Sequence, residues 1–278
     1  MVKSWTGSAF NQVPHSANEI HGDKVAKDFG FKGGLVPGVT VSAYLMHPAV
    51  EAWGQDFLTR GHAHVKVGSP LYDGESFQVD IIERDDGGID SARYSAELIR
   101  PDGTVSAKAE VRLADEGQLA SPPVIRGDKF ADRDTPALEA TPENMARLRE
   151  QGCHAVKFHW RDDHEMNTYL REPREMPQLL RLGNEGAGFA NMSFVLGCSN
   201  WILARVAYMN PWVHLETTSQ NFTPIPFDTK LIAEMEVLDF YNKKGHEFVD
   251  ARVNLFNADV GTCYSAIDLR AIYRLRGM

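Results

Sequence analysis

Two apolar-rich stretches stand out in a chain that otherwise consists of short segments of alternating apolar and polar residues. The first covers residues 39–53 and the second covers residues 189–208, and each is long enough to form a helix of four turns or more. A helix with apolar residues on most of its faces is buried in the core of a protein. We therefore expect one buried helix in each half of the chain.

Alternation of apolar and polar residues after each helix predicts half-buried strands. Turn sequences rich in glycine, proline, asparagine and aspartate separate these strands, and the strongest is the Asp-Asp-Gly-Gly run at 85–88. A helix followed by a meander of antiparallel strands is typical of an α+β layer, in which a sheet wraps around one helix. The predicted strands are 62–67, 77–83, 92–99 and 105–113 in the first half, and 214–222, 230–240, 248–256 and 264–275 in the second.

The order of one helix and then a meander occurs twice, which predicts two copies of one fold in tandem. A local echo supports the duplication, because 70–83 and 224–237 both contain a proline-led turn, an acidic residue and an alternating strand. The N-terminal domain is predicted at 1–115 and the C-terminal domain at 141–278. Residues 116–140 are polar and contain several prolines, as expected for a linker.

Composition and charge exclude several classes of protein. The chain has 278 residues, of which 43% are hydrophobic, and this is ordinary for a globular protein with a sizeable core. Its net charge of −9 disfavours nucleic-acid binding, which usually requires a basic face. No stretch suits a membrane span or a secretory signal. The three cysteines are widely spaced, which argues against a disulfide framework and favours a cytoplasmic location.

The residues best suited to chemistry precede the first predicted helix, between positions 18 and 40. His21 lies at the front, several glycines follow at 30–34, and Pro37-Gly38 marks the expected start of the helix. The start of a helix has unpaired N–H groups and partial positive charge, which can stabilise a carbonyl oxygen as it becomes an oxyanion. A histidine beside it is a candidate acid or base. The alternatives are a loop histidine bonded to backbone and a plain turn glycine.

This segment resembles the signature of the MaoC-like acyl dehydratases and (R)-specific enoyl-CoA hydratases. The matching residues are Asn18, Ile20, His21, Ala26, Gly30, Phe31 and Gly38. Two positions depart from the signature, because the catalytic aspartate of the family falls on Ser16 and a histidine of the family falls on Pro37. The resemblance implies a double hot-dog fold, in which two antiparallel sheets join edge to edge and each wraps around a central helix.

The resemblance also implies an activity, the reversible hydration of trans-2-enoyl-CoA to 3-hydroxyacyl-CoA. The expected site residues are His21, Asn18, Ser16 and Gly38. Gly38 and its neighbouring N–H groups would polarise the thioester carbonyl, and His21 with Asn18 would position and deprotonate water. Ser16 would bind water or orient the imidazole in place of the missing carboxylate. The substrate would be an acyl-CoA or acyl-carrier thioester, without a metal or a redox cofactor, and the C-terminal half would enclose the acyl chain.

Two other functions stay open. A hot-dog protein can also hydrolyse thioesters with a carboxylate, for which Glu19, Asp23 or Glu185 would serve. The departures at Ser16 and Pro37 would also fit a non-catalytic acyl-thioester-binding protein or subunit. A homodimer is one way to cover the edges and faces of such sheets.

Other site types find little support in the sequence. Residues 153–165 are dense in Cys, His, Asp and Glu, but they lack the spacing of a zinc or calcium motif, and a connector strand accounts for them. The chain also lacks the GxSxG and GxGxxG motifs of serine hydrolases and dinucleotide-binding proteins.

Overall fold

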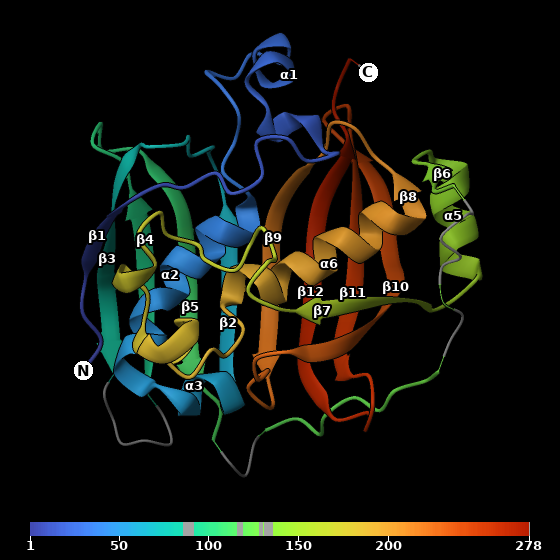
Figure 1. The fold of residues 1–278 in the computed structure, drawn as a ribbon. Coiled ribbons are helices and arrows are strands. Elements are labelled where there is room, and N and C mark those ends of the chain that lie inside the picture. The colour runs from blue at the N-terminus through green and yellow to red at the C-terminus, as the bar shows by residue number, and fades with distance from the viewer. Residues whose placement is uncertain (86–91, 116–118, 128–129, 131–135, 278) are drawn as a thin grey trace.

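A single curved sheet of ten strands wraps around two helices in the computed structural model (Figure 1). The structure describes residues 1–85, 92–115, 119–127, 130 and 136–277. All neighbouring strands of the large sheet are antiparallel, and their order is β1-β3-β4-β5-β2-β9-β12-β11-β10-β7. A second, parallel sheet pairs β6 with β8.

The first half contributes five strands and the helix α2 to this architecture. Its elements are β1 (Trp5–Ser8), η1 (Glu19–His21), α1 (Asp23–Asp28), α2 (Gly38–Trp53), α3 (Gln55–Arg60), β2 (Gly61–Val67), β3 (Ser76–Asp85), β4 (Arg93–Ile99) and β5 (Val105–Leu113).

The second half begins with a short strand and a helix that lie beside its own part of the sheet. Its elements are β6 (Leu138–Glu139), α5 (Pro142–Glu150), β7 (His154–Trp160), η2 (Pro173–Glu175), η3 (Gln178–Leu180), η4 (Gly183–Glu185), α6 (Met192–Val206), β8 (Ala207–Tyr208), β9 (Val213–Asn221), β10 (Thr229–Lys243), β11 (His246–Asn257) and β12 (Cys263–Arg274).

The two halves repeat one topology. The strand order is β1-β3-β4-β5-β2 in the first half and β7-β10-β11-β12-β9 in the second, and the helices α2 and α6 occupy the same place in each. The inner strands β2 and β9 pair with each other and join the halves into one sheet. The predicted tandem α+β fold, with antiparallel sheets wrapped around central helices, is confirmed.

Local details differ from the sequence-based predictions. The helix predicted at 189–208 begins only at Met192, because Asn191 caps it by accepting a hydrogen bond from the N–H of Phe194, and it ends where β8 begins. Strand β1 was not predicted, since four residues are too few for a clear alternation. Most of the turn predicted at 85–88 and part of the linker predicted at 116–140 lie outside the described residues.

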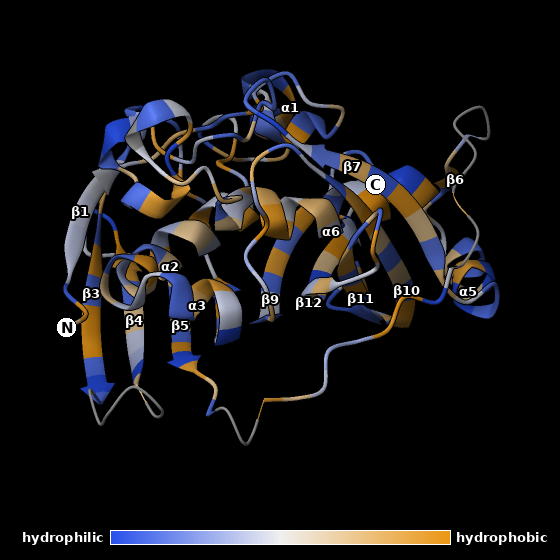
Figure 2. Cartoon of the chain, turned by 60° about the horizontal axis from the view of Figure 1, so that its bottom comes forward, coloured by the Kyte–Doolittle hydropathy of each residue, from blue (hydrophilic) through white to orange (hydrophobic). Residues whose placement is uncertain are grey.

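The core lies between the concave face of the sheet and the two helices. Every residue of α2 from 39 to 50 is buried, and α6 packs against α2 as well as against its own strands. Figure 2 shows hydrophilic and hydrophobic bands alternating along strands such as β3, as expected for strands with one face on a core. Where the two helices start, the buried hydroxyl of Thr40 donates to Gln12 (2.6 Å) and lies 2.8 Å from the hydroxyl of Ser193.

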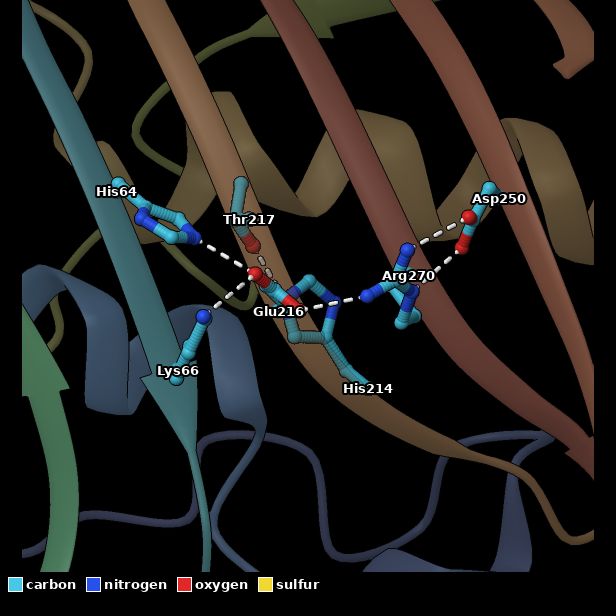
Figure 3. A network of polar contacts seen from close by, with 7 residues as sticks. All are labelled: His64, Lys66, His214, Glu216, Thr217, Asp250 and Arg270. Atoms are coloured by element: carbon cyan, nitrogen blue, oxygen red, sulfur yellow. Dashed lines mark hydrogen bonds and ion pairs between the residues drawn. The ribbon is translucent and has the colours of Figure 1, made fainter. Parts of the chain in front are cut away.

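A polar network on the outer face of the sheet crosses the junction of the halves (Figure 3). Glu216 on β9 is at its centre: Oε1 lies 2.6 Å from Nε2 of His64 on β2, and Oε2 accepts a hydrogen bond from Arg270 at 3.0 Å. Lys66 lies 3.5 Å from Glu216, and Arg270 also forms two bonds of 2.8 Å with Asp250. Partial burial alone would raise the pKa of Glu216, but the His64 hydrogen bond and the charges of Lys66 and Arg270 outweigh it and lower the pKa below the usual value.

The Glu216 network should contribute measurably to stability. We expect Glu216→Gln to lower the free energy of unfolding at neutral pH by about 0.5–1 kcal/mol, the upper range for partly exposed ion pairs. Because the folded-state pKa of Glu216 is lowered, its contribution is present above the normal glutamate pKa and is lost as pH falls through the folded-state value. Urea unfolding at several pH values should show the difference from wild type vanishing in acid.

A matched control is Glu97→Gln, because Glu97 pairs with Lys108 at 2.6 Å within the first half alone. If Glu216→Gln costs no more than Glu97→Gln, or if its cost persists in strong acid, the charge of Glu216 does not stabilise the junction.

Candidate active site

The loop between β1 and α2 lies over the junction of the two halves and is fastened to the second half by Asn18 (Figure 1). Nδ2 of Asn18 donates to the carbonyl of Trp212 (3.0 Å), and the N–H of Trp212 donates to Oδ1 of Asn18 (3.2 Å). Beside it, the N–H and the carboxylate of Glu19 both bind the side chain of Asn210 at 2.9 Å. Asn18 therefore uses its amide to hold the loop in place, so it positions the residues that follow.

His21 ends the turn η1 and is half-buried. Its Nδ1 lies 2.7 Å from the carbonyl oxygen of Leu35. A carbonyl oxygen only accepts hydrogen bonds, so Nδ1 carries the proton and Nε2 is unprotonated. Burial lowers the pKa of His21, and the hydrogen bond to Leu35 offsets this only in part. The imidazole is therefore neutral at neutral pH, and its Nε2, 3.5 Å from Nδ2 of Asn18, can act as a base.

Two cavities meet at His21. Cavity A has a volume of about 240 Å³ and is lined mostly by apolar residues, among them Ile20, Phe31, Leu35, Val67, Leu71 and Ile272. Cavity B has a volume of about 250 Å³ and includes Ser16, Glu165, Gly197, Trp201 and Met209 in its lining. Four residues line both cavities: Asn18, His21, Asn200 and Trp212. Each cavity is slightly smaller than a typical ligand site of roughly 300–1,000 Å³.

The start of α2 lies between the cavities. Gly38 lines cavity A, whereas Pro37 and Val39 line cavity B. The N–H groups of Thr40 and Val41 donate to the carbonyl of Pro37, but those of Gly38 and Val39 have no acceptor among the described residues. The first amides of α2 are thus available to a ligand oxygen, as the sequence predicts for a helix start.

Gly38 has a second role that the sequence does not reveal. A Cβ atom at this position would lie 2.9 Å from Cδ2 of His214 and 3.1 Å from its carbonyl oxygen. The glycine therefore lets the start of α2 approach strand β9, in addition to the predicted room for a ligand carbonyl.

His214 is a buried histidine of the site that sequence reasoning missed. Its Nδ1 lies 2.9 Å from Oδ1 of Asn200 and its Nε2 lies 2.5 Å from the hydroxyl of Thr217, and burial lowers its pKa to about 3. Simple alternation would place 214 and 216 on the same face of β9. A β-bulge changes this, because Glu216 pairs with Arg270 while His214 pairs with the next residue, Ala271. His214 therefore faces inward and Glu216 faces the outer network (Figure 3).

Two of the carboxylates named from the sequence, Glu19 and Asp23, line neither cavity. Glu19 binds Asn210, and Asp23 accepts a hydrogen bond from the N–H of Gly34 at 2.9 Å. The side chain of Glu185 lies outside the described residues. Ser16 does line cavity B with His21, and its hydroxyl donates to the carbonyl of Asn18 (3.1 Å).

Comparison with known proteins defines the fold. No family model and no curated protein matches the chain. Solved structures do match: a putative MaoC domain dehydratase from Chloroflexus aurantiacus is 10% identical, with a TM-score of 0.58 over 100% of this chain and 95% of that one. A conserved hypothetical protein from Mycobacterium tuberculosis, described as a double hot-dog fold, is 11% identical, with a TM-score of 0.52 over 98% and 96% of the two chains. This chain has a double hot-dog fold.

The solved double hot-dog neighbours carry more than one kind of name. An acyl-CoA thioesterase II, TesB2, from Mycobacterium marinum is 12% identical, with a TM-score of 0.55 over 88% of this chain and 91% of that one. Dehydratase and thioesterase names thus occur side by side, and at these identities the likeness shows the fold alone.

The part of the chain that the structure describes contains neither a cluster of metal ligands nor a membrane-spanning helix. No group of three or more His, Cys, Asp and Glu side chains is arranged there to hold a metal ion. No helix among the described residues combines the length and apolar character needed to cross a membrane.

Proposed function

We propose that this chain catalyses the reversible hydration of a 2-enoyl thioester to the 3-hydroxyacyl thioester. The observation that carries the proposal is the place of His21: its unprotonated Nε2 lies where two cavities meet, beside the unpaired amides that begin α2. A base next to hydrogen-bond donors for an oxyanion is the arrangement that this reaction requires.

In this mechanism the thioester carbonyl accepts hydrogen bonds from the N–H groups of Gly38 and Val39. Addition of water to C3 pushes electrons onto the carbonyl oxygen, and the positive end of α2 stabilises this enolate charge. Nε2 of His21 removes a proton from the attacking water. Asn18 keeps His21 in place by fastening the loop to Trp212. The apolar lining of cavity A suits the acyl chain.

Hydrolysis of the thioester is the main alternative activity. It would use a carboxylate. Glu19 and Asp23 make contacts outside both cavities, so hydrolysis would have to use Glu165, which lines cavity B. A third possibility is a protein that binds the thioester without turning it over.

One assay separates the three functions. The protein is incubated with trans-2-enoyl-CoA of several chain lengths, and with the matching carrier-protein thioesters, in the presence of a thiol reagent. Loss of the enoyl absorbance without release of free thiol supports hydration. Release of CoA or carrier thiol contradicts the proposed hydration and shows that the protein is a thioesterase. A thermal shift induced by intact substrate, with no turnover of any chain length, overturns it in favour of a binding protein.

A further inference from the structure

Cavity B contains a carboxylate from the second half of the chain. Glu165 lies between β7 and α6, and it lines cavity B together with His21 and Ser16. Among the described residues that line cavities A and B, Glu165 is the only aspartate or glutamate. It thus shares a single small cavity with the candidate base.

The backbone that carries Glu165 is held rigidly. The N–H of Asn167 donates to the carbonyl of His164 (2.9 Å), and this closes a tight turn around Glu165. The N–H of Met166 donates to Nδ1 of His164 (3.0 Å). The buried amide of Asn191, which caps α6, donates to the carbonyls of Met166 (3.0 Å) and Asn167 (3.1 Å). The position of Glu165 is therefore tied to the start of α6.

The side chain of Glu165 remains available to a ligand. It lies at the exposed rim of cavity B, and no described residue forms a hydrogen bond or an ion pair with its carboxylate. Partial burial raises the pKa of Glu165 above that of an ordinary glutamate, so it holds a proton to higher pH. A carboxyl group that holds its proton longer is better suited to act as a general acid.

We propose that Glu165 is the general acid of this site and supplies, from the second half, the carboxylate that is missing at Ser16. This inference rests on the proposed hydration. As the oxygen of water bonds to C3, Nε2 of His21 takes the proton of that water. The electrons of the C2–C3 double bond move onto the carbonyl oxygen, and the carboxyl of Glu165 then protonates C2 as the enolate collapses. Proton exchange through water returns a proton from the imidazolium of His21 to Glu165, and both groups are restored.

The test uses Glu165→Gln in the full chain. We expect kcat/KM for hydration to fall by about 10²-fold, the lower range for loss of a general acid or base. The limb of the pH profile that reports the acid should also disappear, which a purely structural role would not cause. Glu172→Gln is the matched control. Glu172 is exposed, lies in the same segment between β7 and α6 and lines neither cavity, so this variant should behave as wild type.

A second substitution tests whether Glu165 replaces the missing acid. Ser16 lines the same cavity as Glu165. The double variant Ser16→Asp/Glu165→Gln should therefore have a kcat/KM at least about tenfold higher than that of Glu165→Gln alone.

The outcomes separate this inference from the function on which it rests. If the wild-type protein hydrates enoyl thioesters and Glu165→Gln stays within about twofold of it, or loses activity without any change in the pH profile, Glu165 is not the acid and hydration stands. If the wild-type protein shows no hydration, the proposed function itself is wrong.

Discussion

Replacement of His21 by alanine should reduce kcat/KM for hydration by about 10²–10⁴-fold, the contribution typical of a positioned acid or base. The unprotonated Nε2 of this imidazole is a base in the lining of both cavities, beside the start of α2. Thermal unfolding should change little, because the ring has a single short bond to the protein, at Leu35. Steady-state kinetics and a melting curve of the same preparation measure both effects.

The pH dependence of the wild-type enzyme sharpens this prediction. A base acts when it is deprotonated, and burial lowers the pKa of His21 below the usual 6.5. The acidic limb of kcat/KM, on which activity falls as the base is protonated, should therefore lie below pH 6.5. His15→Ala is the matched control, since His15 is an exposed histidine of the same loop that lines neither cavity. Near-normal turnover by His21→Ala, or an acidic limb centred above 6.5, would show that another group is the base.

The second large effect is expected from Gly38→Ala. The new methyl group would lie 2.9 Å from the ring of His214 and 3.1 Å from its backbone oxygen, and β9 is held by ladders on both sides. Relief of this contact requires the start of α2 to move, so we expect a loss of about 1–3 kcal/mol in the free energy of unfolding. Turnover should fall as well, because the N–H groups of Gly38 and Val39 would move away from the position proposed for the thioester carbonyl. Urea unfolding and kcat/KM measure the two effects.

A matched glycine gives the control for stability. At Gly68 an added Cβ would be 3.8 Å from its nearest neighbour, the carbonyl oxygen of Ser106, and this is an ordinary contact. Gly68→Ala should therefore unfold close to wild type. In a helix, alanine is normally more stabilising than glycine by roughly 0.5–1 kcal/mol. A lower free energy of unfolding for Gly38→Ala would therefore report the close contact with β9 rather than helix propensity. If Gly38→Ala were as stable as wild type, the close approach of β9 to α2 would not constrain this position.

Much of the fold could be predicted from local pattern. The α2 and α6 segments are apolar because they lie inside a wrapped sheet, and the strands alternate because one face packs on those helices and the other meets solvent. The pattern was weakest where an element is very short, as in β1, or where a cap shifts a boundary, as Asn191 does at the start of α6. In such places side-chain hydrogen bonds and edge pairing decide the structure, and periodicity does not report them.

The sequence by itself determined that a helix and a meander occur twice, and that a histidine precedes the start of the first helix. Only the tertiary structure decided which groups surround that histidine. Trp212, which binds Asn18, and Glu165, which lines cavity B with His21, both come from the other half of the chain. His214 enters because a β-bulge turns it inward. These residues lie more than a hundred positions from His21 in the sequence, and their arrangement around it follows from how the two sheets join, which no local pattern of residues encodes.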